Sequence, residues 1–225
     1  MKNMKFYFTP GACSIGIHIL LEELGLVFEA YPINLIKGEH QSAQFLDLNP
    51  KGSIPVLVLQ DGTPLTDFVS IAWWLAKSNP RSGLLPSAIE SEVAILDLMN
   101  YAINTVHGQG FTRIFTTEKY TSNATELTAV QDQGVAIVQR GLALLDRKLA
   151  DGVVSEDHLT IADAALFYIE FWAAKTYIEL PIHCRAHYQR MLQRPAVRQV
   201  LMEEGYHSTL SQSQPTETER LNAIA

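Results

Sequence analysis

The order of secondary-structure signals in the first eighty residues constrains the fold more than any other feature of the sequence. Residues 5–8 form a short apolar run that Pro10 and Gly11 end, and apolar positions recur at helical spacing through 14–24. Residues 28–34 have the pattern of a second strand. A strand–helix–strand unit of this length predicts two parallel strands joined by a right-handed crossover.

A second group of signals adds two strands and a helix. After a short helical piece at 43–48, the segment IPVLVLQDGTPLTD holds two apolar runs around Asp61-Gly62, which is a strong hairpin signal. A further helix is expected at 67–78. The resulting βαβ-ββα order predicts an α/β domain of thioredoxin-like kind, with a four-stranded mixed sheet.

A stretch rich in helix breakers, NPRSGLLP, separates this unit from the rest of the chain. Beyond it we find helical periodicity without a convincing pair of strands, so an all-α domain is predicted, with helices over 90–115, 127–149 and 161–177. The chain has 225 residues, of which 47% are hydrophobic and 18% charged, so it can build two cores. We expect a first domain at 1–80, a linker at 81–86 and a helical domain at 87–225, with a polar tail from about Ser208.

One helix start within the second half has a recognisable cap. Thr160 and Asp163 have capping-box spacing, although Asp replaces the usual Glu or Gln. The Thr160 hydroxyl would accept from the Asp163 amide, and the Asp163 carboxylate from the Thr160 amide. We expect this pair to start a core helix and to serve structure alone.

Charge and cysteine content exclude several classes of function. The formal net charge is −7, with 24 acidic and 17 basic residues, which offers no general attraction for nucleic acid or an anionic membrane. No segment approaches the ~20 apolar residues of a membrane span, and no signal peptide is evident, so a cytoplasmic protein is expected. With only Cys13 and Cys184, neither a disulfide framework nor a multi-cysteine zinc site can form, and no metal is expected.

Cys13 and Ser14 stand where the first strand turns into the first helix. The positive end of a helix dipole favours an anion there, so a Cys13 thiol would have a lowered pKa, and a bound thiolate would be stabilised. The alternative is that Cys13 is merely a small residue at the helix start and Ser14 an N-cap. From these two residues alone, both interpretations are about equal.

The segment Gly52-Ser53-Ile54-Pro55 directly precedes an apolar strand. A proline at a strand start loses no ladder hydrogen bond, and a cis Ile54–Pro55 bond would expose the Ile54 amide and carbonyl. An extended peptide could then pair with Ile54 as an added strand. The alternative is an ordinary loop proline.

Asp67 and Phe68 lie at the start of the third helix. Asp67 could meet the ammonium group of an amino acid while the helix amides meet its carboxylate, or Asp67 could simply be a favourable first-turn acid. In a thioredoxin-like sheet this helix start shares one edge with Cys13 and Ile54. Together the three places outline a slot for a short, anionic, thiol-bearing peptide.

Three motifs make the chain similar to a known family. KFYFTPGACSIGIHILLEELGL, which contains Tyr7, Cys13, Ser14 and His18, resembles the opening motif of bacterial beta-class glutathione transferases. NPKGSIPVLVLQDGTPLTD resembles the second signature of the cytosolic glutathione transferase superfamily, and HLTIADAALF resembles its capping-box helix. The resemblance spans nearly the whole chain and weakens over the last thirty residues.

This resemblance implies glutathione as co-substrate, a homodimer and specific residue roles. Cys13 would lie beside the glutathione sulfur, either forming a mixed disulfide or hydrogen-bonding the thiolate, with Ser14 as a second donor. Asn100 would approach the partner subunit's glutathione, and His107 would face the thiol. The expected catalytic residues are Cys13, Ser14 and His107; the expected glutathione-binding residues are Tyr7, Lys37, Ser53, Ile54, Pro55, Asp67, Phe68 and Asn100.

Several of these residues have a structural alternative, and the sequence departs from the family pattern in places. Tyr7 is expected to pack rather than to donate a proton, and His18 to be a hydrogen-bonded core histidine. Lys37 could be a solvated loop charge. The family has Glu or Gln and then a small residue where this chain has Asp67 and Phe68, which weakens or reshapes the γ-glutamyl contact. In the second domain, Gly108 follows His107 where a lysine is common in the family, and this glycine favours a helix kink. Arg113 adds a cation near the same turn. Three aromatic residues are either core residues or walls of an apolar substrate site: Phe167, Phe171 and Trp172.

The leading functional hypothesis is an enzyme that stabilises the glutathione thiolate for attack on a small hydrophobic electrophile. A variant uses Cys13 for thiol–disulfide exchange, and replacing Cys13 by Ala would distinguish the two. The alternative class is a non-catalytic ligand-binding or accessory protein of the same fold, which the side chain of Phe68 favours. An isomerase or dehalogenase of the same superfamily is a third hypothesis.

Overall fold

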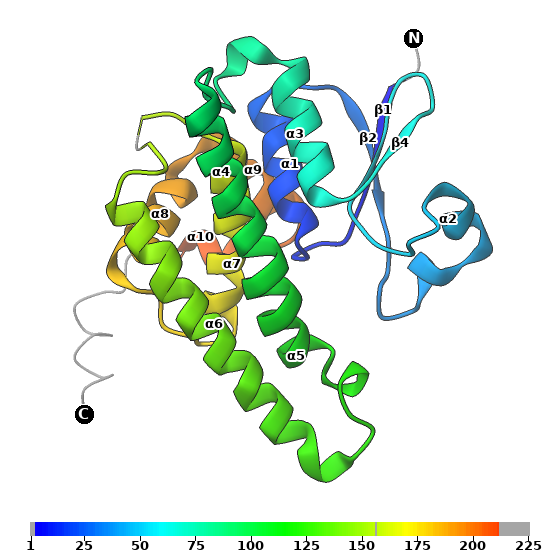
Figure 1. Cartoon of the computed structure of the whole chain (residues 1–225). Helices are drawn as coiled ribbons and strands as arrows, with labels where there is room; N and C mark the ends of the chain where they lie inside the picture. The colour runs from blue at the N-terminus through cyan, green and yellow to red at the C-terminus, as the bar shows by residue number, and fades with distance from the viewer. Residues whose placement is uncertain (1–2, 156, 212–225) are drawn as a thin grey trace.

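The computed structural model describes residues 3–155 and 157–211, and it combines a small sheet with a large set of helices (Figure 1). The strands are β1 (Met4–Phe8), β2 (Phe28–Pro32), β3 (Val56–Val58) and β4 (Pro64–Leu65). They form a four-stranded sheet in the order β2-β1-β3-β4. The expected mixed sheet is confirmed: β1 pairs parallel with β2, whereas the β1–β3 and β3–β4 pairs are antiparallel.

The helices of the first unit lie close to their expected positions. They are α1 (Ser14–Glu23), α2 (Ala43–Leu48) and α3 (Phe68–Ser78), with the short 3-10 turn η1 (Glu39–Gln41) before α2. The helix α1 is buried over 14–21, because the sheet, α3 and helices of the second half pack around it. The helix α2 lies at the opposite side of the sheet from α1, where Figure 1 shows it standing apart from the helical part.

The second half is helical throughout the described residues, as the sequence predicts. After the 3-10 turn η2 (Pro80–Ser82), it contains the helices α4 (Ile89–Tyr101), α5 (Thr112–Phe115), α6 (Leu127–Ala150), α7 (Ile161–Lys175), α8 (Ile182–Gln193), α9 (Pro195–Glu203) and α10 (His207–Ser211). Two 3-10 turns, η4 (Thr117–Lys119) and η5 (Ala124–Glu126), connect α5 to α6. No helix in the described ranges has the length and apolarity needed to cross a membrane. The domain limits at residues 80 and 87 remain predictions.

A π-helix, η3 (Ala102–Phe111), continues α4 without interruption and leads into α5. Its i→i+5 hydrogen bonds widen each turn relative to an α-helix. Asn100 and His107 therefore do not repeat on one face as the seven-residue spacing of an α-helix would require. Figure 1 shows the continuous helix running beside α6, and Gly141 allows a close approach there: a Cβ at this position would lie 2.5 Å from Val106 Cγ2.

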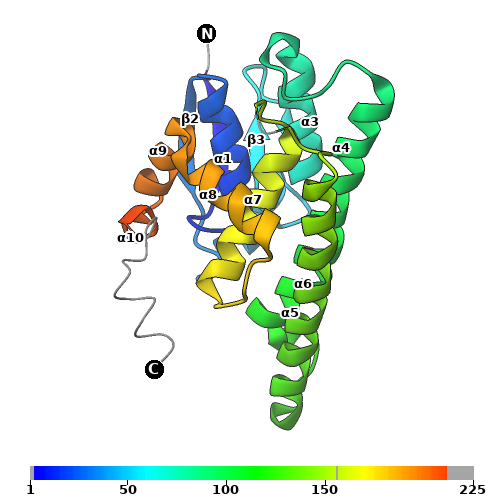
Figure 2. The same ribbon diagram turned by 90° about the vertical axis from the view of Figure 1, so that its left-hand side faces the viewer.

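The helix α7 is the central element of the second half. Its residues 161–173 are all buried, and α1, α3, α4 and α8 pack against it. Figure 2 shows α8 in front of α7, with α6 on one side and α9 on the other. The capping box at its start is present, and Thr160 donates its amide to Asp163 Oδ2 at 2.7 Å.

Asp163 also belongs to a buried ionic group that joins α7 to α8. His187 contacts Asp163 Oδ1 through Nε2 at 3.0 Å and Glu170 Oε2 through Nδ1 at 2.7 Å. All three side chains are at most 3% exposed. Burial alone would lower the pKa of His187, but the two carboxylates outweigh it and raise the pKa to about 9. His187 is therefore an imidazolium held between two carboxyl groups at neutral pH.

Candidate active site

Cys13 lies at the junction of the β1–α1 loop and α1, where the sequence places it. It is the residue before the first turn of α1, and its thiol donates a weak hydrogen bond to the Ile54 carbonyl at 3.8 Å. The Ile54–Pro55 bond is cis, as the sequence makes plausible. The single thiol and the exposed strand-forming backbone therefore meet at one edge of the sheet.

The expectation of a lowered Cys13 pKa is wrong for the structure described here. Burial of the thiol raises its pKa to about 12, and this outweighs the hydrogen bonds from the amides of Ser14 and Cys13 that act in the opposite direction. The negative charge of Asp67 raises the pKa further. Loss of solvation disfavours a thiolate more than the helix start favours it. Cys13 is therefore a neutral thiol at pH 7.

Ser14 is fully buried, and its hydroxyl closes the β1–α1 loop. It accepts a hydrogen bond from the Thr9 amide and donates one to the Thr9 carbonyl, both at 3.1 Å. The hydroxyl proton is thus engaged inside the loop rather than directed at a ligand. The structure gives Ser14 a positioning role at the start of α1.

Asp67 holds the far end of the same edge together with two neighbours. Its carboxylate accepts from the Lys51 ammonium at 3.0 Å and from the Ser53 hydroxyl at 3.1 Å. About half of each side chain in the Lys51–Asp67 pair is exposed, so the pair contributes little to stability. The carboxylate is thus paired with an ammonium group of the chain itself, and its role toward a bound amino acid stays a prediction. Lys51 itself was missed, although it stands within the second signature motif.

The side chain of Phe68 points away from this edge. It is 3% exposed and packs on the ring of Tyr168, with centroids 5.4 Å apart. It also fills the space above Gly16, where a Cβ would lie 2.8 Å from the Phe68 ring. A large residue is accommodated because it occupies the interface with α7 rather than the ligand edge. Only the backbone of Phe68 remains for the γ-glutamyl group, so its side chain gives no reason to favour a non-catalytic protein.

The remaining sequence-predicted binding residues lie further apart. Tyr7 stacks on Tyr31 with centroids 5.0 Å apart, on the sheet face that α2 covers, so it packs as expected. Lys37 is exposed in the loop after β2, where its backbone amide donates to Asn34 Oδ1 at 2.9 Å. Asn100 is half-buried near the end of α4. In the described residues the hydrogen bond of the Cys13 thiol goes to the Ile54 carbonyl and not to any of these three side chains, whose binding roles stay predictions.

His107 from the π-helix contacts two aromatic residues of α7. Its Nδ1 lies 3.3 Å from the Tyr168 hydroxyl, and its ring meets that of Trp172 edge-on with centroids 4.8 Å apart. Burial lowers the pKa of His107 to about 4, so the imidazole is neutral at pH 7. Burial raises the pKa of Tyr168 well above its usual value, and the charge of a Cys13 thiolate would raise it further. Tyr168 thus interacts with both His107 and Cys13. This could not be predicted from the sequence, because the pattern around Tyr168 matches an ordinary buried helix.

An aromatic wall of Phe111, Phe115 and Trp172 continues from His107. Phe111 and Phe115 stack at 5.5 Å, and Trp172 lies edge-on to both rings at 5.3 and 5.2 Å. Phe115 is 48% exposed, so the wall opens to solvent at that end. Of the aromatic residues considered from sequence, only Trp172 belongs to the wall; Phe167 and Phe171 are core residues.

Arg113 lies on the same helix turn, and its guanidinium is directed elsewhere. It covers the ring of Tyr120 at 4.5 Å and donates to the Gln109 carbonyl. The cation is thus held against the α5–α6 connection and does not join His107.

Gly11, two residues before Cys13, is held by side chains from the helical half. Its amide donates to Glu204 Oε2 and its carbonyl accepts from Trp172 Nε1, both at 2.7 Å. We call this pair of hydrogen bonds the Gly11 clamp. The Tyr206 ring covers the remaining space, since a Cβ on Gly11 would lie only 1.9 Å from its hydroxyl. Sequence reasoning missed the clamp, because its partners are 161 and 193 residues away.

Comparisons with known proteins agree with this architecture. Residues 11–78 match the family model of the glutathione S-transferase N-terminal domain, and residues 128–199 match that of the C-terminal domain. The chain is 35% identical over 210 residues to glutathione S-transferase GstA of Escherichia coli O157:H7, which covers 90% of this chain and 99% of the relative. It is 28% identical over 205 residues to glutathione S-transferase GST-4.5 of Xanthomonas campestris pv. campestris, with 90% and 99% covered.

Solved structures give the same answer. A bacterial beta class glutathione S-transferase of Sphingomonas chungbukensis has a TM-score of 0.75 at 27% identity, with 90% of this chain and 99% of that chain covered. A sphingomonad glutathione S-transferase complexed with glutathione has a TM-score of 0.73 at 30% identity, with 89% and 98% covered. Because both family models match and the likeness extends over nearly the whole chain, the protein belongs to the glutathione S-transferase family.

Proposed function

We propose that the protein is a glutathione transferase that joins the glutathione sulfur to a small hydrophobic electrophile. The observation that carries this proposal is that the thiol of Cys13, at the start of α1, lies 3.8 Å from the carbonyl oxygen of Ile54, directly before β3. The thiolate sulfur forms a bond to the electrophilic carbon, and the leaving group departs with its bonding electrons. Relatives named as glutathione S-transferases over most of the chain support this reaction.

Glutathione would bind as an extended peptide along the edge described above. The exposed Ile54 backbone pairs with the cysteinyl residue, and Ser53 and Pro55 shape the edge on either side of it. The Asp67 carboxylate, which already holds the Lys51 ammonium at 3.0 Å, binds the γ-glutamyl ammonium beside the Phe68 amide. Lys37 binds the glycyl carboxylate when its loop side chain reaches the peptide.

The protein would stabilise the thiolate with neutral donors at a positive helix end. The Cys13 thiol, with its pKa of about 12, keeps its proton and donates it in a hydrogen bond to the glutathione sulfur. Tyr168, held by His107, supplies a second neutral donor in the same buried region. The thiol proton of glutathione leaves to water, and the start of α1 favours the anion that remains. A protonated Cys13 is a poor nucleophile, which favours conjugation over thiol–disulfide exchange.

The electrophile would bind against the aromatic wall. Phe115 presents an exposed apolar ring, and the buried rings of Phe111 and Trp172 pack against it. Holding both reactants in one geometry replaces a bimolecular encounter by a positioned reaction. The wall has no charged group, so it suits an uncharged aromatic substrate.

We further propose that the protein is a homodimer of the cytoplasm. Trp73 on α3 and Ile89 and Val93 on α4 are 43%, 69% and 57% exposed, and Trp73 Nε1 donates to Glu92 Oε1 between them at 3.4 Å. Large apolar side chains gathered on two adjacent helices favour burial against a second subunit. Both cysteines are free, which suits a reducing compartment.

The test combines retention on immobilised glutathione with conjugation of a model aryl halide. We expect the wild-type protein to be retained and to conjugate, and Cys13→Ala to keep most of the conjugation but to lose any thiol-exchange activity. A folded wild-type protein that does neither would overturn the enzyme assignment. If Cys13→Ala loses conjugation and the wild-type protein mainly catalyses thiol–disulfide exchange, the mechanism is instead covalent, with a mixed disulfide on Cys13.

A further inference from the structure

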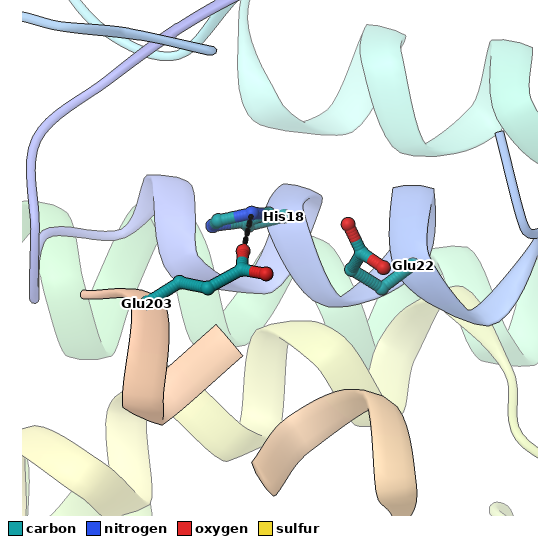
Figure 3. A group of neighbouring side chains, drawn as sticks. All are labelled: His18, Glu22 and Glu203. Atoms are coloured by element: carbon teal, nitrogen blue, oxygen red, sulfur yellow. Dashed lines mark ion pairs between the residues drawn. The ribbon is translucent and has the colours of Figure 1, made fainter. Parts of the chain in front are cut away.

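We propose that a divalent metal ion binds between α1 and α9, held by Nε2 of His18 and by the carboxylates of Glu22 and Glu203. One ligand atom from each residue lies within 4.8 Å of the others, which is a separation that small side-chain movements can close around one ion. Figure 3 shows the Glu203 carboxylate, from α9, below the His18 ring and the Glu22 carboxylate, from α1 itself, to the right of the ring. None of these residues belongs to the proposed glutathione site.

His18 carries the argument because its two nitrogens have different surroundings. The side chain is 2% exposed and lies among the rings of Phe6, Phe8 and Phe28, at 5.6, 5.4 and 5.6 Å, as expected for a core histidine. Its Nδ1 contacts the buried Glu204 Oε1 at 2.9 Å. A carboxylate on one nitrogen fixes the tautomer that turns the lone pair of the other nitrogen outward, which is the usual arrangement of metal-binding histidines.

The second nitrogen of His18 is buried, and no atom of the described residues forms a hydrogen bond with it. Glu203 Oε2 lies 3.3 Å from Nε2, yet Nε2 makes no hydrogen bond, so this oxygen stands off the direction in which the nitrogen points. Buried polar atoms normally have a partner, and one without it calls for an explanation. An ion placed between the nitrogen and the carboxylates supplies that partner.

The carboxylates are arranged to accept a cation. Gln199 donates to Glu203 Oε1 at 3.0 Å, which leaves Oε2 turned toward His18. Glu22 comes one helical turn after His18, so both side chains lie on the same face of α1. The carboxyl groups of Glu22, Glu203 and Glu204 surround one imidazole, and a divalent ion would balance the negative charge gathered there.

One imidazole and two carboxylates suit Zn²⁺ among the common divalent ions. Glu203 is 47% exposed, so water can complete the coordination and the ion can enter from solvent. The ion would bridge α1 to α9. Glu204, which contacts His18, also accepts from the Gly11 amide, so the bridge would be coupled to the Gly11 clamp.

The proposal is tested by titrating Zn²⁺ into the full-length protein by calorimetry. Every variant carries Cys13→Ala, so that the thiol of the proposed active site does not compete for the ion. We expect one Zn²⁺ per chain in this background, and affinity reduced about tenfold or more by Glu22→Gln and by Glu203→Gln. Glu118→Gln, an exposed glutamate in η4, is the matched control and should leave binding unchanged.

A thermal denaturation series gives a second readout. An ion that binds only the folded state raises the melting temperature, and this increase should be absent in Glu203→Gln. Both glutamates are partly exposed, so these variants are expected to fold even if His18→Gln does not. Absence of binding in the Cys13→Ala protein, or an affinity in Glu22→Gln and Glu203→Gln equal to that of the Cys13→Ala parent, would overturn the proposal.

Discussion

Cys13 is subject to two opposing local effects. The start of α1 favours a thiolate through its dipole, by about 0.3–1 kcal/mol at ordinary exposure. Removal of the thiol from water disfavours the charged form by more, because the pKa rises to about 12. The sequence shows the helix start but not the side chains that enclose the sulfur. This is why the position of Cys13 could be predicted from sequence and its protonation state could not.

A neutral Cys13 should react slowly with alkylating agents. We expect iodoacetamide at neutral pH to modify Cys13 more slowly than free glutathione, with the rate still rising above about pH 9 because only the thiolate reacts. Mass spectrometry of the modified protein measures this rate. The Cys13→Ala variant reports any contribution from Cys184, whose pKa burial also raises. Alkylation of Cys13 faster than that of free glutathione would contradict the burial argument.

Gly11 should tolerate no side chain. Gly11→Ala places a Cβ 1.9 Å from the Tyr206 hydroxyl and forces alanine to φ +73°. The left-handed backbone costs about 1–2 kcal/mol, and displacement of a packed ring adds typically about 1–3 kcal/mol. Urea unfolding measures the sum. Gly25→Ala is the matched control, because Gly25 has φ +59° and no atom lies within 4 Å of its Cβ position. This variant should show only the cost of the left-handed backbone. If both variants lose the same free energy of unfolding, Tyr206 does not constrain the loop.

At the scale of whole elements, local patterns placed most helices and strands within a few residues. Gly and Pro ended them, apolar periodicity distinguished their types, and the Asp61-Gly62 turn fixed the hairpin. The π-helix η3 is different, because its apolar residues also fit an α-helical period. Gly108 and Gly110 indicate a departure from regular geometry without specifying which one. The relation between Asn100 and His107 therefore needed the structure.

The indole of Trp172 links α7 to the thiol loop, and its loss should affect catalysis. Trp172→Phe keeps an aromatic ring in the wall but leaves the Gly11 carbonyl without its 2.7 Å donor. An unpaired buried carbonyl costs about 1–3 kcal/mol, and about 1.4 kcal/mol corresponds to a tenfold change in rate. We expect kcat/KM for conjugation to fall roughly tenfold, with KM for glutathione raised.

Trp74→Phe on α3 serves as the control for this measurement. Trp74 is half-buried outside the wall and the clamp, so its replacement should leave both constants unchanged. An unchanged kcat/KM in Trp172→Phe would mean that the Gly11 carbonyl is held well enough by the rest of the loop.

At the scale of the whole molecule, buried polar side chains connect the helices across long stretches of sequence. His187 joins α7 and α8, and Glu204 joins the end of α9 to α1 and the thiol loop. Sequence patterns carry no signal for such pairs, because each partner alone is an ordinary helix residue. The thioredoxin-like order and the helical second half could be predicted; the groups that join them could not.

The His187 group should make stability fall as the pH rises. Its pKa is about 9 in the folded protein and about 6.5 when unfolded, so the folded state binds more protons between these values. The charged His187 contributes on the order of 3 kcal/mol to the free energy of unfolding. This contribution is complete below about pH 6.5 and is lost as the pH rises through about 9. Burial raises the pKa of Glu170 to about 7, which also makes stability fall with rising pH, at lower values.

Urea unfolding at about pH 6 and about pH 9, in wild type and His187→Gln, measures this term. The variant should be less stable at the lower pH and should lose less stability between the two. Titrating groups away from His187 contribute equally to both proteins, whereas the pKa of Glu170 also changes when the imidazolium is removed. The difference between the two pH profiles therefore reports the His187–Glu170 pair. Parallel pH profiles would show that His187 is not charged in the folded state.

The Gly11 clamp also bears on how the active site forms during protein synthesis. Trp172, Glu204 and Tyr206, which hold or cover the loop before Cys13, follow it by more than 150 residues. A nascent chain can fold its N-terminal sheet early, since domains fold in order as they emerge from the ribosome. The thiol loop gains these partners only after residues 172–206 have been synthesised. A chain that ends before Trp172 would therefore present a sheet with Cys13 but with an unsupported loop. The reactive centre forms only when the helical half has also been made.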